Sequence, residues 1–432
     1  MKILVLGSGG REHAIVWALA KSPIVEAIWA APGNGGTADI SLAAEGAGQV
    51  QNITLDPLDA DEIIDFCEAM GVNLVVIGPE APLVAGIADA LRLAGIPVYG
   101  PSAMDARLEG SKEFAKEFME KNNIPTAAYA SFTEEAPALG YVQEKGAPIV
   151  IKADGLAAGK GVVVALTVKE AEDAVKACFD GAFGDAGSKV VIEECMTGPE
   201  CSMLSFVTDG KSFPMAPSQD HKRAFDGDTG PNTGGMGVYS PVPIVTNEEM
   251  SEMVGIMEVA AAAVPSYRGT LYGGFMLTPE GPKIVEFNVR FGDPETQVVL
   301  PRLESDLAEV MAAVAAGNAD DIKLEWSPKW AVAVVLASEG YPGSYEKGKV
   351  ITGIEDAEAQ EDVIVFHAGT AIDEDGKLVT AGGRVLNVVA LGDTFDEARD
   401  KAYEACELIK FEGKQMRSDI GARALRGREA WD

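Results

Sequence analysis

Residues 151–164 read IKADGLAAGKGVVV, which combines two apolar strand patterns with a glycine-rich turn between them. The stretch departs from the Walker phosphate loop G-x-x-x-x-G-K-[ST], because Asp154 stands at the first glycine position and Gly161 at the Ser/Thr position. The residues after the turn are β-branched, so they predict a second strand and not a helix. The stretch therefore indicates a β-hairpin within an α+β unit.

This hairpin carries groups that suit phosphate binding. Its glycines let backbone N–H groups approach an anion closely, and its two lysines can neutralise phosphate charge. The alternative is a plain turn whose lysines face solvent. We favour phosphate binding because Lys152 lies within an apolar strand, where an ammonium group without a partner is costly.

A second informative stretch, residues 285–295, reads VEFNVRFGDPE. The period-two geometry of a strand places Glu286, Asn288 and Arg290 on one face, while the apolar side chains between them face the core. Carboxylate and amide oxygens suit Mg²⁺, which keeps further positions for water and substrate phosphates. The pattern favours a site for a hard cation and a phosphate, and a solvated strand face with a Glu–Arg pair is the open alternative.

The first hundred residues alternate strand and helix patterns. Predicted strands cover 2–7, 25–31, 74–78 and 97–99, and predicted helices cover 11–21 and 83–94. Apolar strands separated by helices predict a parallel sheet that is covered on both faces. Ligands of such sheets bind beyond the carboxyl ends of the strands.

The glycine-rich segment GSGGRE follows the first predicted strand, at residues 7–12. It departs from the dinucleotide fingerprint G-x-G-x-x-G, because Glu12 occupies the last glycine position. Arg11 at a helix start suits a sugar phosphate as well as it suits NAD, so both ligands remain open at this point.

The rest of the chain continues with mixed helix and strand patterns and becomes richer in strands after residue 318. Predicted helices cover 111–122, 167–179, 250–264 and 306–316, and predicted strands cover 148–153, 162–166, 190–194, 274–277, 283–288, 330–338 and 384–391. Two capping boxes, Thr167–Glu170 and Thr394–Glu397, indicate helix starts.

Residues 217–240 lack periodicity and are rich in Gly, Asp, Pro and Thr. An aperiodic loop of this length inside a compact domain is typically functional. Its aspartate spacing does not fit an EF-hand calcium loop. His221 in this loop is as consistent with a structural histidine as with a catalytic one.

Length, charge and cysteine content exclude several classes of protein. The chain has 432 residues, a net charge of −32 and five scattered cysteines without a C-x-x-C pair. At about 150 residues per domain, the length predicts about three domains. The acidity opposes nucleic-acid and anionic-lipid binding, and the longest apolar run, 330–337, is far shorter than the roughly 20 residues of a membrane span. We expect a cytoplasmic protein with no nucleic-acid or membrane partner, and no disulfide framework or zinc cluster.

Eight motifs occur in order across nearly the whole chain: GSGGREHA, APGNGGT, GPEAPL, IKADGLAAGKGV, QDHKR, DTGPNTGGMG, EFNVRFGDPETQ and FHAGT. Each motif alone is weak, but the ordered set closely resembles the phosphoribosylamine–glycine ligase family of the ATP-grasp superfamily. The resemblance implies an α/β and α+β multidomain fold. It places a Rossmann-like domain at 1–101, an ATP-grasp core at 102–122 and 191–327, a mobile lid at 123–190 and a C-terminal α+β domain at 328–432.

The same resemblance implies an activity in purine (IMP) biosynthesis. ATP, glycine and 5-phosphoribosylamine would give glycinamide ribonucleotide, ADP and phosphate through a glycyl-phosphate intermediate, with Mg²⁺ or Mn²⁺. It implies small-molecule partners and a monomer, with a dimer left open.

Residues matching the family pattern divide into an ATP set and a metal pair. The ATP set, which includes two phosphate-binding lysines, the glycine turn, the adenine hinge and a ribose-binding carboxylate, is Lys112, Lys152, Gly155, Gly159, Lys160, Gly161, Glu193, Glu194, Cys195, Met196 and Glu200. Glu286 and Asn288 match the metal ligands. Many ATP-grasp enzymes have a further metal-binding acid near the position of Gly274, so here water or substrate must complete the coordination.

Charge complementarity suggests roles for the remaining groups. Arg290 is the candidate for the glycine carboxylate or the γ-phosphate, Asp220 for the glycine ammonium, and Lys152 for a direct part in phosphoryl transfer. We expect the sugar-phosphate site to use Gly9, Gly10, Arg11, Asn34 and Glu80. No general base for the amine is evident.

Three other functions compete with this interpretation. One is a different ATP-grasp ligase, such as a carboxylase, although the segments QDHKR and GPNTGGMG favour the glycine enzyme. A second is an NAD-dependent oxidoreductase, which leaves everything after residue 150 without a role. The third is a nucleotide-binding module without catalytic activity.

Overall fold

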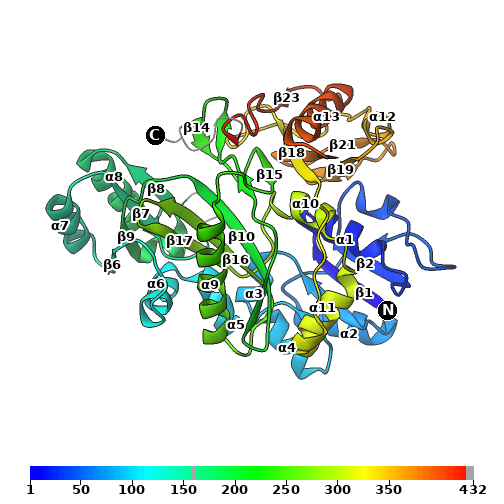
Figure 1. Cartoon of the computed structure of the whole chain (residues 1–432), viewed down its shortest axis with the longest axis horizontal. Coiled ribbons are helices and arrows are strands. Elements are labelled where there is room, and N and C mark those ends of the chain that lie inside the picture. Colours follow the sequence, from blue (N-terminus) through cyan, green and yellow to red (C-terminus); the bar gives the residue numbers. More distant parts are fainter. Residues whose placement is uncertain (157–160, 425–432) are drawn as a thin grey trace.

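The computed structural model describes residues 1–156 and 161–424. Figure 1 shows the segment between β6 and β9 projecting at one end of the molecule, while the N-terminal and C-terminal parts lie side by side at the other end. Within the described residues, no helix combines the length and apolarity that crossing a bilayer requires.

The N-terminal sheet confirms the predicted parallel arrangement. Its strand order is β3-β2-β1-β4-β5, and every neighbouring pair is parallel. The strands are β1 (Lys2–Gly7), β2 (Ala27–Pro32), β3 (Gln51–Asn52), β4 (Leu74–Ile77) and β5 (Val98–Tyr99). The helices are α1 (Gly10–Ala20), α2 (Ala60–Met70), α3 (Glu80–Val84) and α4 (Ile87–Leu93), with a short η1 (Thr37–Asp39).

Two details of this region differ from the sequence prediction. The single helix predicted at 83–94 is two helices, because Gly86 between them adopts a φ of +85°, which interrupts the helical backbone. The helix α2 and the strand β3 were not predicted. Only two residues of α2, Ile63 and Cys67, are buried, and β3 has only two residues.

The central sheet forms the floor of the candidate site. It is antiparallel with the order β11-β10-β16-β17. Its strands are β10 (Glu200–Thr208), β11 (Lys211–Pro214), β16 (Arg268–Thr278) and β17 (Gly281–Asn288). The surrounding helices are α5 (Ala103–Gly110), α6 (Lys112–Lys121), α9 (Asn247–Ala263), α10 (Thr296–Val299), η3 (Leu300–Arg302), α11 (Leu307–Ala316) and η4 (Ala319–Asp321). Apolar residues of this sheet and of the N-terminal sheet share two core clusters, so the two parts pack as one body.

The segment 129–194, which contains most of the lid expected at 123–190 and is called the lid below, forms a separate small sheet. Its antiparallel order is β6-β9-β7-β8. Its elements are β6 (Tyr129–Phe132), α7 (Glu135–Lys145), β7 (Ile149–Ala153), β8 (Val162–Ala165), α8 (Val168–Phe179), η2 (Gly184–Ser188) and β9 (Val190–Glu194). The predicted hairpin and the Thr167–Glu170 capping box are confirmed. The lid buries an apolar cluster of its own between this sheet and its two long helices.

The C-terminal sheet has the order β12-β15-β18-β22-β19, with β23 also pairing with β18. Its strands are β12 (Gln219–Asp220), β15 (Gly237–Ser240), β18 (Trp330–Ser338), β19 (Val363–His367), β22 (Arg384–Gly392) and β23 (Lys414–Gln415). Helices α12 (Ile354–Glu358) and α13 (Phe395–Leu408) cover it, and β20 (Thr370–Ile372) pairs with β21 (Leu378–Thr380).

The loop predicted at 217–240 contains four short strands. Between β12 and β15, the strands β13 (Arg223–Phe225) and β14 (Thr229–Asn232) form a two-stranded hairpin. Strands of two to four residues leave too few repeats for periodicity to reveal them, which explains why a loop was predicted. Because β15 pairs with β18, this segment is joined to the C-terminal sheet.

Candidate active site

A cavity of about 640 Å³ lies between the lid, the central sheet and the β12–β15 segment. Its wall carries charged side chains from distant parts of the chain, from Arg11 to Arg384. Most of the predicted ATP and metal residues line it: Lys112, Lys152, Gly155, Gly161, Glu193, Glu194, Cys195, Met196, Glu200, Glu286 and Asn288. The remaining two, Gly159 and Lys160, lie outside the described residues.

Two lysines from different elements, α6 and β7, line the cavity. Lys112 is the first residue of α6, and its Nζ donates to the Gly155 carbonyl oxygen at 2.8 Å. Lys152 lies on β7 of the lid, is 5% exposed, and donates to the Val285 carbonyl oxygen at 3.2 Å. Lys152 thus joins the lid to the central sheet beside the predicted metal residues.

A buried ion-pair chain supports Lys152. The Glu193 carboxylate on β9 lies 2.9 Å from Lys152 Nζ and 3.0 Å from Nζ of Lys116, on α6. Lys116 is 2% exposed and also donates to Thr126 Oγ1 at 2.7 Å. Burial lowers the pKa of Lys116 to about 8, although Glu193 opposes this shift. Lys116 was not predicted, because helical periodicity alone does not distinguish it from a solvent-facing lysine.

Asp154 connects the glycine turn to the start of α6. Its carboxylate accepts hydrogen bonds from Ser111 Oγ and from the backbone N–H of Glu113, both at 3.2 Å. An aspartate near a helix N-terminus is favourable because it satisfies unpaired N–H groups and complements the helix dipole. Lys189 of the lid also pairs with Glu113, so the lid contacts this helix start at two points.

The predicted metal residues share one face of β17, as period two requires. Asn288 Nδ2 donates to Glu286 Oε1 at 3.4 Å. Partial loss of hydration opposes the ionisation of the Glu286 carboxyl group. The positive charges of Lys222, Lys152 and Lys112 outweigh this effect and lower its pKa. Gly274 lies opposite Glu286 in the sheet register and supplies no carboxylate.

The donor set fits a hard cation only in part. Within the described residues, no group of three or more His, Cys, Asp and Glu side chains is arranged to hold a metal ion. An ionised carboxylate and an amide oxygen on one face suit a cation such as Mg²⁺ that takes its other ligands from water and phosphate oxygens. Glu286 and Asn288 therefore fit a cation that takes most of its ligands from water or phosphate oxygens.

Arg290 lines the cavity but is held by protein acceptors. Its guanidinium lies 3.2 Å from Glu80 Oε2 and 2.8 Å from Glu109 Oε1, and it donates to the Phe291 carbonyl oxygen at 3.1 Å. Burial opposes the charge of Arg290, but Glu109 and Glu80 outweigh this and raise its pKa. Glu109 also accepts from the Val289 N–H at 2.9 Å, and no sequence pattern marked it.

The residues predicted for the sugar phosphate divide into two groups. Arg11 and Glu80 line the cavity, whereas Gly9, Gly10 and Asn34 lie outside its wall. The Gly9 N–H donates to Glu12 at 2.7 Å, and the Arg11 N–H donates to Asp293 at 3.2 Å. These two N–H groups at the start of α1 therefore already have carboxylate partners.

Asn34 instead joins the N-terminal and C-terminal parts. Its Nδ2 donates to the carbonyl oxygens of Ser8 at 3.0 Å and His367 at 2.8 Å. His367 in turn donates its backbone N–H to Nδ1 of His13 at 3.0 Å. The motifs APGNGGT and FHAGT thus meet at a buried interface between the two parts.

A polar group that includes the predicted Asp220 also lines the cavity. Asp220 pairs with Lys222 at 2.9 Å, and both side chains line the wall. Nearby, Tyr272 OH is 3.2 Å from Glu295 Oε1 and 2.7 Å from Ser202 Oγ. Burial raises the pKa of Glu295, and Asp220 adds to the shift. Lys222 could have been predicted from its i, i+2 spacing to Asp220, whereas Glu295 carries no periodic signal.

The parallel N-terminal sheet, together with a cavity between the antiparallel lid sheet and the antiparallel central sheet, defines the chain as an ATP-grasp protein. Family models for the phosphoribosylglycinamide synthetase N domain, ATP-grasp (A) domain and C domain match residues 1–109, 110–296 and 331–423. The chain belongs to the phosphoribosylglycinamide synthetase family.

Individual relatives agree with this assignment. The chain is 50% identical to phosphoribosylamine–glycine ligase of Vibrio cholerae serotype O1, over the full length of both proteins. It is also 50% identical to that of Escherichia coli O6:H1, covering 98% of this chain and 99% of the relative. The crystal structure of phosphoribosylamine–glycine ligase from Thermotoga maritima aligns with a TM-score of 0.83 at 36% identity, covering 97% of this chain and all of that one.

Proposed function

We propose that this protein ligates glycine to 5-phosphoribosylamine at the expense of ATP, giving glycinamide ribonucleotide, ADP and phosphate in purine biosynthesis. The single observation that carries the proposal is the convergence of Lys112, Lys152 and Glu286 on one cavity in a chain of this family. Lysines that neutralise phosphates and a carboxylate that takes a cation are what phosphoryl transfer to another carboxylate requires.

The reaction must overcome the repulsion between the glycine carboxylate and the ATP γ-phosphate. Lys112 and Lys152 would offset that repulsion and bind the phosphates. Glu286 and Asn288 would hold Mg²⁺ or Mn²⁺, which supplies further charge stabilisation when bound. Phosphorylation converts the glycine carboxylate into an acyl phosphate, and the amine of phosphoribosylamine then displaces phosphate to form the amide.

The lid has a protective part in this scheme. Glycyl phosphate reacts with water, so the cavity must be closed while the amine attacks. The glycines of the β7–β8 turn, including Gly155, Gly159 and Gly161, together with Lys160, would cover the phosphates. The strand end Glu193, Glu194, Cys195 and Met196 would bind the adenine edge, and Glu200 would bind the ribose.

The amino-acid and sugar sites are assigned by charge. Asp220 would bind the glycine ammonium beside Lys222, with which it pairs at 2.9 Å. Arg290 would act on the glycine carboxylate or the γ-phosphate only by exchanging a contact with Glu80 or Glu109. Arg11 and Glu80 would face the sugar phosphate, with Gly9, Gly10 and Asn34 shaping the surrounding backbone.

The same proposal includes a cytoplasmic location, a monomeric state and four domain ranges. These are the N-terminal domain at 1–101, the ATP-grasp core at 102–122 and 191–327, the lid at 123–190 and the C-terminal domain at 328–432. The five cysteines are free thiols, and four of them are buried, which is consistent with a reducing compartment. Light scattering of the purified protein would distinguish a monomer from a dimer.

ADP release with each substrate omitted in turn tests the proposed activity. We expect ADP only when ATP, glycine, phosphoribosylamine and Mg²⁺ or Mn²⁺ are all present, with glycinamide ribonucleotide formed in equal amount. Bicarbonate-dependent ADP release without glycine would instead indicate a carboxylase. Failure of every amino acid and amine to stimulate ADP release would refute the proposal.

A further inference from the structure

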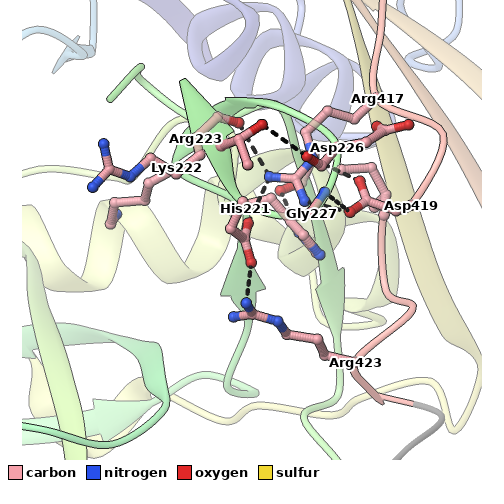
Figure 2. Close-up of polar contacts among 12 residues, drawn as sticks. His221, Lys222, Arg223, Asp226, Gly227, Arg417, Asp419 and Arg423 are labelled. Carbon is pink, nitrogen blue, oxygen red and sulfur yellow. Dashed lines mark hydrogen bonds and ion pairs between the residues drawn. The ribbon is translucent and has the colours of Figure 1, made fainter. Parts of the chain in front are cut away.

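The residue between Asp220 and Lys222 faces away from the cavity. Asp220 and Lys222 line the wall, whereas His221 is 7% exposed and packs beneath it. Period-two alternation along an extended chain explains the opposite directions. Figure 2 shows Lys222 extending away from a group of charged residues around Arg417. The segment that carries two cavity residues is therefore held from its other side.

His221 joins this segment to residues 417–424, near the end of the described chain. The Gly421 N–H donates to His221 Nε2 at 3.0 Å, so Nε2 accepts and carries no proton. Nδ1 then carries the proton and lies 3.3 Å from the Gly237 carbonyl oxygen. Burial and the nearby Arg417 lower the pKa of His221, which is consistent with this neutral tautomer.

Arg417 makes the most extensive contacts of this segment. Its side chain is 1% exposed, and its guanidinium bonds Asp228 at 2.7 Å and both carboxylate oxygens of Asp419 at 2.7 and 2.8 Å. It also donates to the Arg223 carbonyl oxygen at 3.1 Å, directly after Lys222 in the chain (Figure 2). A buried guanidinium is tolerated only with such partners.

The tip of the β13–β14 hairpin is tied to the same segment. The Gly227 N–H donates to Asp419 at 2.8 Å, and the Ser418 N–H donates to Asp226 at 2.8 Å (Figure 2). Arg423 pairs with Asp228 at 2.6 Å. The hairpin has only three and four residues in its strands, and β14 is exposed throughout. Because a two-stranded hairpin is marginally stable alone, these charged contacts supply its order.

We propose that residues 417–424, chiefly through Arg417, form a clasp that positions Asp220 and Lys222 in the cavity. Arg417 is a positioning residue: it touches the hairpin and not the cavity, and it acts through the backbone of residues 221–223. The link to glycine binding rests on the proposed function, whereas the link between the clasp and the hairpin does not.

The test compares Arg417→Met and Asp228→Asn with Lys401→Met. Lys401 is a matched control because it lies on α13 of the same region and, among the described residues, its ion pairs are with the partly exposed Glu397 and Asp362. For each full-length variant we would measure hydrogen exchange of residues 219–235 without substrate, kcat and KM for glycine, and the Kd of MgADP.

In Arg417→Met, we expect the hairpin amides to exchange about tenfold faster and kcat/KM for glycine to fall about tenfold. Hydrogen exchange in β7 and β9 and the Kd of MgADP should stay within about twofold of wild type. Arg417→Lys, which keeps the charge but not the bidentate contact, should recover part of the loss. Adding Arg417→Met to Asp220→Asn should cost less than about twofold more, because both changes act on one group.

Two results would overturn the proposal. One is unchanged hairpin exchange in both Arg417→Met and Asp228→Asn. The other is faster hairpin exchange with glycine kinetics like those of Lys401→Met. If Arg417→Met does not fold, Asp228→Asn carries the comparison, because it removes one carboxylate and leaves Asp419 in place. A wild type inert toward glycine would refute the proposed function, while the exchange experiment would still decide whether Arg417 holds the hairpin.

Discussion

Replacing Lys116 with methionine removes one member of the buried ion-pair chain in the wall of the cavity where we propose that ATP binds. Methionine keeps most of the length of the side chain but cannot pair with Glu193 or donate to Thr126. Lys116 belongs to α6 and Glu193 to β9, so this pair joins the helix to the lid. The change therefore tests whether a residue outside the expected phosphate set controls nucleotide binding.

The geometry sets the expected magnitude. Removing one partner of a buried ion pair costs about 3–5 kcal/mol, because the other partner loses its compensation. Glu193 would keep Lys152 at 2.9 Å, so the cost should lie near the lower end. About 3 kcal/mol corresponds to roughly 150-fold in the folding equilibrium constant, and the loss of ATP binding approaches this factor if the nucleotide requires the same geometry of helix and lid. In addition, Glu193 would then pair with Lys152 and not with Lys116, which would pull the Lys152 ammonium group away from the bound ATP phosphates.

Steady-state kinetics and MgADP titration would measure the effect. We expect kcat/KM for ATP to fall about 100-fold and the Kd of MgADP to rise, with KM for glycine changed by less than about threefold. Lys121→Met is the control, because Lys121 lies on the same helix and is exposed. Circular dichroism would establish that both variants fold. A folded Lys116→Met protein with wild-type ATP kinetics would refute the reasoning.

Three further predictions concern the metal face, pH and close packing. Glu286→Gln removes the ionised ligand and should lower kcat about 100-fold in Mg²⁺ assays, with metal-free ADP binding retained; an equal loss of metal-free binding would contradict the metal role. Burial lowers the pKa of His367 to about 4, so its contribution to stability is present above pH 6.5 and is lost as pH falls toward 4. Urea unfolding should therefore show about 2 kcal/mol less stability from this group at pH 5 than at pH 7.5, and a His367→Gln variant with the same pH slope would disprove its source. A Cβ on Gly78 would lie 2.2 Å from Glu12 Oε1, so Gly78→Ala should lower the unfolding free energy by about 1–3 kcal/mol. Gly48→Ala is the control, because a Cβ there would meet nothing within 4 Å, and it should cost little. Equal effects of the two changes would argue against the Gly78 contact.

Local patterns in the sequence determined many of the elements and some of their pairing, but they missed α2, β3 and the four short strands within 217–240. The apolar runs of the first hundred residues predicted a parallel sheet, and the strand pattern on both sides of the glycine turn predicted the β7–β8 hairpin; both are confirmed. The alternation in 285–290 placed Glu286 and Asn288 on one face, as β17 does. These predictions succeed because helix and strand periods are properties of adjacent residues.

Only the tertiary structure decided which charged groups meet. Arg290 follows the end of β17 at Asn288, and its partners Glu80 and Glu109 lie about 200 residues earlier in the chain. The segment with no periodicity contributes β15 to the C-terminal sheet, and Arg417 holds its tip. Such contacts depend on how separate sheets pack, because packing brings distant charges together and removes the water that would otherwise screen them.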